Sequence, residues 1–472
     1  MKDVDVPELD ARRFEGVLER DQCRRFVRRL EQAADRFRGR RLWHVNSTEQ
    51  GGGVAEMLHF LLGYLSGVGI DTRWAVLEGN EDFFTVTKRI HHLLHGRPGD
   101  GHGLDPTARV VYEQTVKEAL AELQGRVGPD DVVFLHDPQT AALAPELKRL
   151  ATTVVWSCHV GIDQPNDLAR TAWDFLRPYV LAADAYVFSR RAYCWEGLPS
   201  ERLALIPPCI DAFAPKNQPL EPPQVAAILQ TAGILDAREG DREAPAFRHL
   251  DGSLGRVVRR AEMIQDQPIP PGVPIVLQVS RWDPLKDPLG VLEGFARHLP
   301  EQLGAHLVLA GPAVESVSDD PESEQVLQQV RRAAAAIPQQ ARDRLHLACL
   351  PMDDLEENGA MVNALQRRAD VIVQKSLAEG FGLTVAEAMW KHRPVVASRV
   401  GGIQDQITHG SSGLLLDDPG DLASFGSMAA ILLEDRDAAV RLGEEAHRRV
   451  RQDYLAPHRL TRELDLIERL AG

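Results

Sequence analysis

Apolar runs alternate with longer stretches of helical periodicity in the first half of the chain. The runs are rich in β-branched residues and lie at 41–47, 72–77, 131–136, 152–159 and 185–188. Helical patterns lie between them, at 54–68, 108–125 and 168–182. Several runs are apolar almost throughout, which is typical of strands covered by helices on both faces of a parallel sheet. The pattern predicts a doubly wound α/β domain.

The same alternation returns in the second half of the chain. Strand candidates there lie at 274–280, 306–310, 345–350, 370–375 and 394–398. A proline-rich run at 207–223 separates the halves and predicts a linker, and the polar segment 233–272 predicts an irregular insertion. The sequence therefore predicts an α/β fold with two Rossmann-like doubly wound domains facing a cleft, where ligands bind at the carboxyl ends of the strands.

The expected domain boundaries follow from this pattern. We expect the first domain to span 1–208 and to include a charged helix at 13–40. The second domain is expected at 209–455, with the irregular insertion at about 233–272. A last amphipathic helix, at 456–472, is expected to pack back toward the first domain.

Composition and charge disfavour several classes of partner. The formal net charge is −15 and there is no long basic tract, which disfavours nucleic acid and anionic membranes. The five cysteines are scattered and form no Cys-x-x-Cys motif, so we expect a reducing compartment rather than disulfides. No signal-peptide pattern and no apolar run of about 20 residues occur, and we expect a cytoplasmic protein.

Two cations follow the first strand of the second domain. In the segment from Gln278 to Lys286, the strand is expected to end at Ser280, and Asp283 can cap a new helix. Arg281 and Lys286 would then lie near a helix N-terminus, where cations and backbone N–H groups bind a diphosphate. On this segment alone, two solvated surface cations are the alternative interpretation.

A glycine-rich turn follows a later strand of the same domain. Gly380 and Gly382 would let the backbone approach a ligand closely, just before the next helix. Thr384 and Glu387 have the spacing of a capping box, which alone could explain this glutamate. Glu379 has no such structural explanation, because it is a carboxylate within the turn itself.

Three consecutive glycines follow the first strand of the first domain, at Gly51, Gly52 and Gly53. The loop is not G-x-G-x-x-G and no Walker lysine follows it, which disfavours an NAD site and a P-loop. Its backbone N–H groups could still bind phosphate, and a flexible turn is the alternative interpretation.

Polar side chains also follow other strands of the first domain, namely Glu78, His136, Asp137, Gln139 and His159. Carboxylates, amides and imidazoles suit the recognition of sugar hydroxyls. Taken singly, each could equally be an ordinary loop residue. We expect no metal site, because His91 and His92 lack the spacing of metal ligands.

In these segments the chain resembles the retaining family-four glycosyltransferases, which have the two-domain GT-B architecture. The resemblance rests on Glu379 through Glu387, on Arg281 and Lys286, and on the Val-Gly-Gly-Ile run at 400–403. The first half is similar to the trehalose glycosyltransferring synthases at 44–56, 74–79 and 83–88. Together the similar regions cover most of 41–215 and 272–465.

The resemblance implies transfer of glucose from a nucleoside-diphosphate glucose to free glucose, which gives α,α-1,1-linked trehalose with retention. The nucleotide is left open among ADP, UDP and GDP. The resemblance implies no required cofactor, and its implied partners are a sugar nucleotide and a monosaccharide. A homodimer is a further expectation.

The resemblance also implies roles for individual residues. The implied catalytic residues are Glu379, Arg281, Lys286 and His159. The implied donor-binding residues are Gly51, Gly52, Gly53, Arg281, Lys286, Leu350, Gly380, Phe381, Gly382, Leu383, Thr384 and Glu387. The implied acceptor-binding residues are Asn46, Glu78, Lys88, His136, Asp137 and Gln139.

Three alternatives remain open at the level of sequence. The acceptor could be a sugar phosphate or an aminosugar, although no added Arg/Lys pair for a phosphate is recognisable. The chain could be an inactive sugar-nucleotide sensor on the same scaffold, or a phosphorylase that uses inorganic phosphate. The segment 233–272 departs from the family pattern and has no assigned role.

Overall fold

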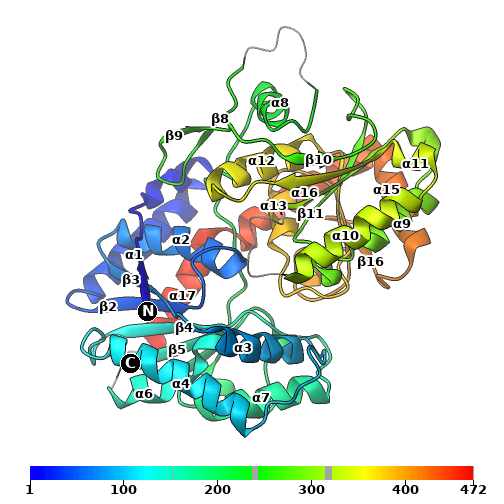
Figure 1. Cartoon of the computed structure of the whole chain (residues 1–472). Coiled ribbons are helices and arrows are strands. Elements are labelled where there is room, and N and C mark those ends of the chain that lie inside the picture. Colours follow the sequence, from blue (N-terminus) through cyan, green and yellow to red (C-terminus); the bar gives the residue numbers. More distant parts are fainter. Residues whose placement is uncertain (151, 237–242, 314–320, 471–472) are drawn as a thin grey trace. The chain divides into compact units, whose positions relative to one another are not determined.

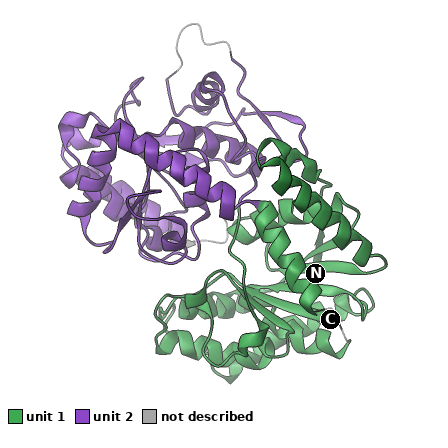
Figure 2. Cartoon of the chain, turned by 180° about the vertical axis from the view of Figure 1, so that it is seen from behind, with its two compact units in different colours: residues 1–209, 456–472 green, residues 210–455 purple. Residues whose placement is uncertain are grey.

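The computed structural model describes residues 1–150, 152–236, 243–313 and 321–470. These residues form two compact units (Figures 1 and 2). Unit 1 comprises Met1–Cys209 and Ala456–Gly472, and unit 2 comprises Ile210–Leu455. Unit 2 is therefore inserted into unit 1 along the chain.

Unit 1 contains a seven-stranded sheet in the order β1-β3-β2-β4-β5-β6-β7. All neighbouring strands are parallel except for the edge strand β1, which runs antiparallel to β3. The strands are β1 (Lys2–Val4), β2 (Arg41–Asn46), β3 (Asp71–Val76), β4 (Val132–His136), β5 (Thr153–Cys158), β6 (Ala185–Phe188) and β7 (Leu203–Leu205). Every residue of β4 and all but the first of β2 are buried, because helices cover both faces of the sheet.

The helices of unit 1 are η1 (Ala11–Gly16), α1 (Arg20–Arg36), α2 (Gly53–Ser66), α3 (Glu81–Leu94), α4 (Pro106–Leu123), α5 (Asp137–Thr140), η2 (Ala141–Leu143), α6 (Ala144–Arg149), α7 (Asp167–Val180), η3 (Arg191–Tyr193), η4 (Ser200–Arg202) and α17 (Ala456–Leu470). Helices α3, α4 and α7 share one hydrophobic core with Trp43 and Val45 of β2 and with Val133 and Leu135 of β4. Helix α17, red in Figure 1, contacts α1 and α2.

Two helical predictions differ from the structure of unit 1. The helix expected at 13–40 is divided into the short η1 and the longer α1, with the break at residues 17–19. Helix α3 was not predicted at all. It begins after Asn80, whose side chain accepts a hydrogen bond from the Phe83 N–H at 2.9 Å. This Asn80 cap is a helix-start signal that could have been read from the sequence.

Unit 2 contains a second seven-stranded sheet, in the order β10-β13-β12-β11-β14-β15-β16. Its strands are β10 (Glu262–Ile264), β11 (Ile275–Val279), β12 (His306–Pro312), β13 (Leu345–Leu350), β14 (Val371–Gln374), β15 (Val395–Ser398) and β16 (Leu414–Leu416). The six strands from β11 onward are parallel and have the strand order of a dinucleotide-binding fold. The prediction of two Rossmann-like α/β domains is confirmed.

The helices of unit 2 are α8 (Pro222–Thr231), η5 (Pro284–Lys286), α9 (Pro288–His298), η6 (Glu301–Leu303), α10 (Pro321–Ala336), α11 (Gln339–Arg342), α12 (Leu355–Arg368), α13 (Leu383–Trp390), α14 (Ile403–Gln406), α15 (Leu422–Glu434) and α16 (Arg436–Asp453). Helices α9, α10 and α15 share one hydrophobic core with alternate residues of the strands. Helices α12 and α13 also contact the sheet, and every residue of β11 and β14 is buried.

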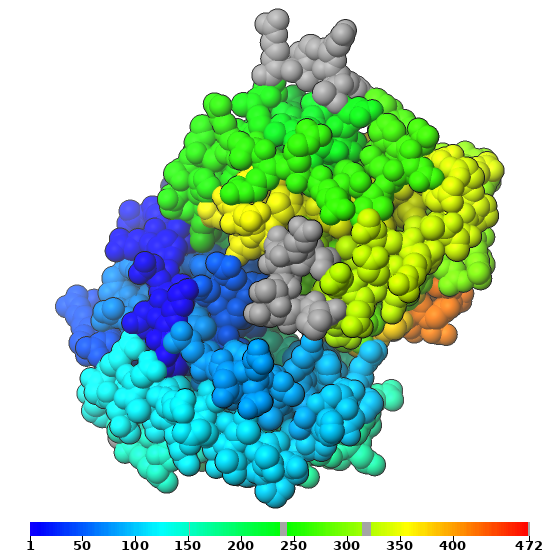
Figure 3. All heavy atoms as spheres, viewed as in Figure 1, coloured from blue at the N-terminus to red at the C-terminus, as the bar shows by residue number. Residues whose placement is uncertain are grey.

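The segment predicted to be irregular, 233–272, lies mostly outside helices and strands where the structure describes it, but it contains three short strands. Strands β8 (Ala246–Arg248) and β9 (Leu254–Arg256) pair with each other, and β10 pairs antiparallel with β13. In the space-filling view, green atoms, which include the described part of this segment, lie beside yellow atoms from later in unit 2 (Figure 3). Strands of three residues are too short to leave a periodic pattern, which is why these strands were not predicted.

Candidate functional site

The strand order of unit 2 places two loops next to each other. Strands β11 and β14 are parallel neighbours, and the connections from them lead to opposite sides of the sheet order. In open α/β sheets, ligands bind at the carboxyl ends of strands at such a switch point. The segment with Arg281 and Lys286 follows β11, and the segment with Glu379 follows β14.

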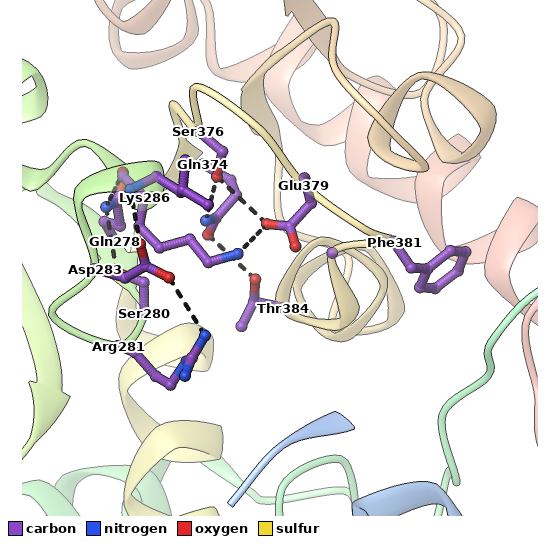
Figure 4. A network of polar contacts seen from close by, with 12 residues as sticks. Gln278, Ser280, Arg281, Asp283, Lys286, Gln374, Ser376, Glu379, Phe381 and Thr384 are labelled. Atoms are coloured by element: carbon purple, nitrogen blue, oxygen red, sulfur yellow. Dashed lines mark hydrogen bonds and ion pairs between the residues drawn. The ribbon is translucent and has the colours of Figure 1, made fainter. Parts of the chain in front are cut away.

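Lys286 and Glu379 form an ion pair at this switch point (Figure 4). Lys286 Nζ lies 2.5 Å from Glu379 Oε2, and the side chains are 17% and 10% exposed. Ser376 Oγ donates to the same carboxylate oxygen at 3.4 Å, and Gln278 Nε2 donates to the Lys286 carbonyl at 3.0 Å. Two residues predicted to act on one ligand are thus in direct contact.

Arg281 extends from the same loop but is far more exposed. Its side chain is 63% exposed, and its Nη2 lies 3.3 Å from Asp283 Oδ2. The loop therefore carries one exposed cation and one partly buried cation, and both are ion-paired.

The helix predicted to begin at Pro284 starts later. Asp283 Oδ1 accepts from the Leu285 N–H at 2.8 Å, but this caps only the 3-10 turn η5. Asp287, in the left-handed conformation with φ 48°, ends that turn and caps α9 through the Gly290 N–H. Lys286 consequently precedes α9 and does not lie in its first turn.

The glycine-rich turn after β14 packs tightly against the segment at 402–406. Gly382 has φ 86°, and it is the N-cap of α13 without any side-chain cap. The Gly402 N–H donates to the Gly380 carbonyl at 3.0 Å, and Gln406 Nε2 donates to the Phe381 carbonyl at 2.6 Å. The Phe381 side chain is buried, with its ring centroid 5.5 Å from that of Tyr454. A ligand could therefore use the backbone of this turn, and not the Phe381 ring.

The capping box predicted for Thr384 and Glu387 is wrong. The left-handed Gly382 begins the helix two residues before Thr384, whose Oγ1 instead donates to Gln374 Oε1 at 3.1 Å. Glu387 is a carboxylate only 1% exposed. Its Oε2 lies 3.4 Å from Gln366 Nε2 and its Oε1 lies 3.6 Å from Lys216 Nζ. Glu387 therefore has no role in starting the helix.

Leu350 and Leu383 differ in what they can offer a ligand. Leu350 is buried at the end of β13, and its carbonyl accepts from the Ala313 N–H at 2.7 Å. Its side chain is part of the core, so a direct side-chain contact with a base is not available. Leu383 is the first residue of α13 and is half-buried.

In unit 1 the glycine loop follows β2, beside the switch between β2 and β4. Gly51 and Gly52 have φ 71° and 132°, values that favour glycine, and both are exposed. Gly53 begins α2, which has no side-chain cap. The N–H groups of this helix end are therefore not satisfied by a capping side chain, as an anion site requires.

Three histidines form a chain across β2, β4 and the end of β5. His44 Nδ1 lies 2.9 Å from His136 Nε2, and His136 Nδ1 lies 3.3 Å from His159 Nε2. Burial lowers the pKa of His44 and of His159 to about 3, and the pKa of His136 well below its usual value. The charge of Arg459 acts in the same direction on each pKa. The three rings are therefore neutral at physiological pH.

Asp137 fixes the end of this chain. It has φ 63°, which is unusual for a residue other than glycine, and its Oδ1 accepts from the His159 N–H at 2.8 Å. Burial raises the pKa of the Asp137 carboxyl to about 7. Strain and perturbed titration at one position are typical of functional sites.

The remaining predicted residues of unit 1 divide into two groups. Asn46 is the last residue of β2, and Gln139 lies in α5, which directly follows β4. Asn46 Oδ1 accepts from Trp74 Nε1 at 2.9 Å, and Gln139 Oε1 is buried without a hydrogen-bond partner. Glu78 is 66% exposed and pairs with the amino group of Met1 at 2.9 Å, and Lys88 is exposed on α3. The structure brings His136, Asp137 and His159 together, but places Glu78 against the amino terminus.

Sequence reasoning missed two of these features. His44 was noticed only as part of a family motif, and its place in the histidine chain was not predicted. Gln139 was predicted without its unpartnered oxygen. The available signal for His44 was a histidine among the apolar residues Leu42, Trp43 and Val45 of a central strand.

Within the described ranges, no three or more His, Cys, Asp or Glu side chains are grouped to hold a metal ion. Over the same residues, no helix has both the length and the apolar character needed to cross a bilayer.

Comparison with known families matches both units. Residues 44–195 match the family described as "Trehalose synthase, N-terminal domain", and residues 259–449 match "Glycosyl transferases group 1". The trehalose synthase of Rubrobacter xylanophilus is 36% identical over 447 residues, which are 94% of each chain. That of Pyrococcus horikoshii is 32% identical over 446 residues, again 94% of each chain. A trehalose phosphorylase of Grifola frondosa is 27% identical over 420 residues, 86% of this chain and 54% of that one.

Solved structures share the fold. A UDP-forming α,α-trehalose-phosphate synthase of Burkholderia vietnamiensis superposes with a TM-score of 0.66 at 18% identity, over 91% of this chain and 98% of that one. One of Burkholderia xenovorans, solved with glucose-6-phosphate, superposes with a TM-score of 0.67 at 15% identity, over 92% and 100%. The predicted resemblance is confirmed, and the chain belongs to the trehalose synthase family of GT-B glycosyltransferases.

Proposed function

We propose that the chain is a retaining glucosyltransferase that moves glucose from a nucleoside-diphosphate glucose to free glucose and forms α,α-1,1-linked trehalose. The observation that carries this proposal is the Lys286–Glu379 pair, beside the uncapped N-terminus of α13. Cations next to free backbone N–H groups are the usual way in which α/β folds bind a diphosphate.

The donor would bind at the switch point of unit 2. Arg281 and Lys286 would hold the diphosphate and offset the negative charge that develops on the leaving nucleotide. The N–H groups from Gly380 to Thr384 would supply further donors. Glu387, buried among polar groups, would accept hydrogen bonds from the ribose hydroxyls, and Glu379 would lie by the donor sugar.

In this proposal, the acceptor and the transferred sugar use groups of unit 1. Neutral imidazoles both donate and accept hydrogen bonds, so His136 and His159 suit sugar hydroxyls. The unpartnered Oε1 of Gln139 is available to accept from a hydroxyl. Asn46, Asp137 and Lys88 would complete the acceptor set, and the glycine loop at 51–53 would bind phosphate. Glu78 is the weakest member of the set, because it pairs with Met1.

Retention fits attack on the same face as departure. The bond from the glucose C1 to the phosphate oxygen breaks, and a bond from C1 to the acceptor hydroxyl oxygen forms on that face. The acceptor proton passes to the departing phosphate oxygen, so no protein nucleophile takes part. Lys286 and Arg281 would lower the energy of this step by stabilising the phosphate charge.

A matrix of donors and acceptors tests the proposal. ADP-, UDP- and GDP-glucose are each assayed with glucose, glucose 6-phosphate and glucosamine, and NMR determines the linkage of each product. We expect free glucose to be the preferred acceptor and the linkage to be α,α-1,1. Preference for glucose 6-phosphate would exclude the trehalose-forming reaction proposed here.

A phosphorylase is the second candidate, because a relative at 27% identity carries that name. Incubation with trehalose and inorganic phosphate distinguishes the two, since a phosphorylase releases glucose 1-phosphate without any nucleotide. A sugar-nucleotide sensor would bind the donor without turnover. Arg281→Ala should lower turnover, and unchanged turnover would contradict the role given to this arginine.

A further inference from the structure

A pocket in unit 2 lies near the amino ends of the sheet strands, whereas the switch point is at their carboxyl ends. It has a volume of about 360 Å³ and is lined by α8, by the end of α12 and by the segment at 269–272. Arg367 and Arg368 end α12, just before β14 begins, and Arg393 lies two residues before β15. The donor loops follow the other ends of the same strands, so this pocket is separate from the proposed donor site.

Three guanidinium groups line this pocket, and only one of them has an ion-pair partner. Arg368 Nη1 lies 3.2 Å from Asp370 Oδ2. Among the residues that the structure describes, neither Arg367 nor Arg393 forms an ion pair. Arg367 is held by the Gln218 carbonyl at 2.9 Å, and Arg393 by the Ala369 carbonyl at 3.1 Å. Both are thus bound by neutral groups.

The two unpaired guanidinium groups are poorly solvated. Burial lowers the pKa of Arg367 to about 10, and the neighbouring charge of Arg393 lowers it further. Burial also lowers the pKa of Arg393, whose Nε is buried without a hydrogen-bond partner. Leaving buried cations unpaired is costly, and an anion in the pocket would offset that cost.

The shape and lining of the pocket indicate the class of ligand. The pocket is also lined by apolar residues, among them Leu220, Pro222, Val225, Ile269 and Pro270. Guanidinium groups bind phosphate in a bidentate manner, and this pocket brings three of them together. The charges of Glu221 and Asp370 act on Arg367 and Arg393 only from beyond ion-pair distance. Asp236, which also lines the pocket, is exposed and so is better screened by solvent than the arginines. We propose that this pocket binds a small organic phosphate monoester, at a site distinct from the donor site.

Ala226 offers a matched pair of variants to test the proposal. It lies on α8, is half-buried and lines the pocket without any polar contact of its side chain. Ala226→Glu places a negative charge beside the site, and Ala226→Lys places a side chain of similar length with a positive charge there. Arg393→Gln provides an independent variant that removes one cation.

The measurement is titration calorimetry on the full chain with ribose 5-phosphate and glycerol 3-phosphate, up to about 10 mM. Ribose and inorganic phosphate serve as controls for the sugar and for the anion alone. We expect one site per chain, a dissociation constant at least about tenfold higher in Ala226→Glu and in Arg393→Gln, and no such loss in Ala226→Lys. Ribose should not bind, and inorganic phosphate should bind more weakly than either ester.

Lys286→Gln tells this site apart from the proposed donor site. Binding of the esters should be unchanged in that variant, whatever happens to its transferase activity. Loss of binding in Lys286→Gln with retention in Ala226→Glu would assign the anion to the donor site and overturn the proposal. Absence of binding by both esters to the unmodified chain would overturn it as well.

Discussion

Lys286 and Glu379 have opposite charges in a place that solvent reaches only partly. Each charge offsets the other, and a diphosphate would compete with Glu379 for Lys286. The pair therefore keeps a cation ready at the switch point of unit 2 and limits the cost of burying it.

Removing this cation should affect catalysis more than folding. Lys286→Gln is expected to lower kcat/KM for the nucleotide donor about 100- to 1000-fold, which is the usual effect of losing one group that stabilises a developing anion. Steady-state kinetics gives the loss, and circular dichroism checks the fold. Arg297→Gln is the control, because Arg297 forms only an exposed pair with Glu293 within α9. Equal activity of the two variants would contradict the role of Lys286.

Asp137 should make stability depend on pH in a defined direction. Its pKa is raised from 3.8 to about 7, so the folded state binds more protons than the unfolded state between these values. The contribution of the Asp137 carboxyl to the free energy of unfolding is fully present below about pH 4 and is lost as the pH rises to about 7. Asn tolerates the left-handed backbone and can still accept from the His159 N–H.

The comparison of wild type with Asp137→Asn isolates this effect from the histidines, whose lowered pKa values act in the opposite direction. From pH 5 to pH 7, the free energy of unfolding of the wild type should fall relative to the variant by roughly 1 to 2 kcal/mol, and the difference should be constant above pH 8. Urea denaturation at each pH measures it. A difference that does not change with pH would contradict the raised pKa.

At the scale of residues, the sequence was informative where a side chain had no structural explanation. Glu379 stood out for this reason, and the structure places it against Lys286, 93 positions away. Glu387 was given a capping role that it does not have, because a left-handed glycine starts the helix earlier than the Thr-x-x-Glu spacing suggests. Contacts across strands, such as the chain from His44 to His159, depend on strand order, which local spacing does not contain.

At the scale of elements, the glycine turn at 380–382 packs against the glycine run at 400–403, beside the proposed donor site. A Cβ atom added to Gly402 would lie 2.7 Å from the Phe381 Cα and 3.0 Å from the Gly380 carbonyl oxygen. Both contacts involve backbone, which cannot turn aside as a flexible side chain could. The run at 400–403 therefore holds the turn after β14 at close range, although it was recognised only as a family pattern.

Gly402→Ala should move the turn that contains Glu379. We expect a loss of about 1 to 3 kcal/mol in the stability of unit 2, which is typical of overpacking, together with a raised KM for the donor. Thermal unfolding and kinetics measure the two effects. Gly103→Ala is the control, since a Cβ atom there meets nothing within 4 Å. If Gly402→Ala behaves like this control, the close packing described here is wrong.

The periodic pattern predicted the long buried strands well and the short edge strands not at all. The five strands predicted in each half appear in the structure with boundaries that differ by at most two residues. The strands that were not predicted have only three residues each, and tertiary contacts rather than local pattern define them; they are β1, β7, β8, β9, β10 and β16. Capping geometry likewise decided where α9 and α13 begin.

At the scale of the whole molecule, helix α17 belongs to a unit from which it is separated by 246 residues of chain, 210–455. Arg29 of α1 pairs with Asp465 at 2.8 Å and with Glu468 at 2.5 Å. Leu460 and Leu464 of α17 are buried, and so is the Arg459–Glu463 ion pair at 2.8 Å. Unit 1 therefore depends on a segment that lies beyond unit 2 in the sequence.

Leu460→Ala should consequently weaken unit 1 and leave unit 2 unchanged. A fully buried leucine truncated to alanine costs about 2 to 5 kcal/mol. Hydrogen exchange should show faster exchange in α1 and α2, with unchanged protection in α12. Ile431→Ala, at an exposed position of α15, should change neither region. Lost protection in α12 with α1 and α2 unaffected would contradict the assignment of α17 to unit 1.

The inserted position of unit 2 has a consequence for how the chain folds during synthesis. Ile210 and Leu455 form a parallel bridge, with the Ile210 N–H donating to the Tyr454 carbonyl at 2.9 Å, so the first and last residues of unit 2 meet. Domains generally fold as units as they leave the ribosome. Unit 2 is complete once residue 455 has emerged, whereas unit 1, begun first, still lacks α17. A released chain that ends at residue 455 would thus carry a finished unit 2 and a unit 1 with the apolar side of α1 and α2 uncovered, a substrate for chaperones.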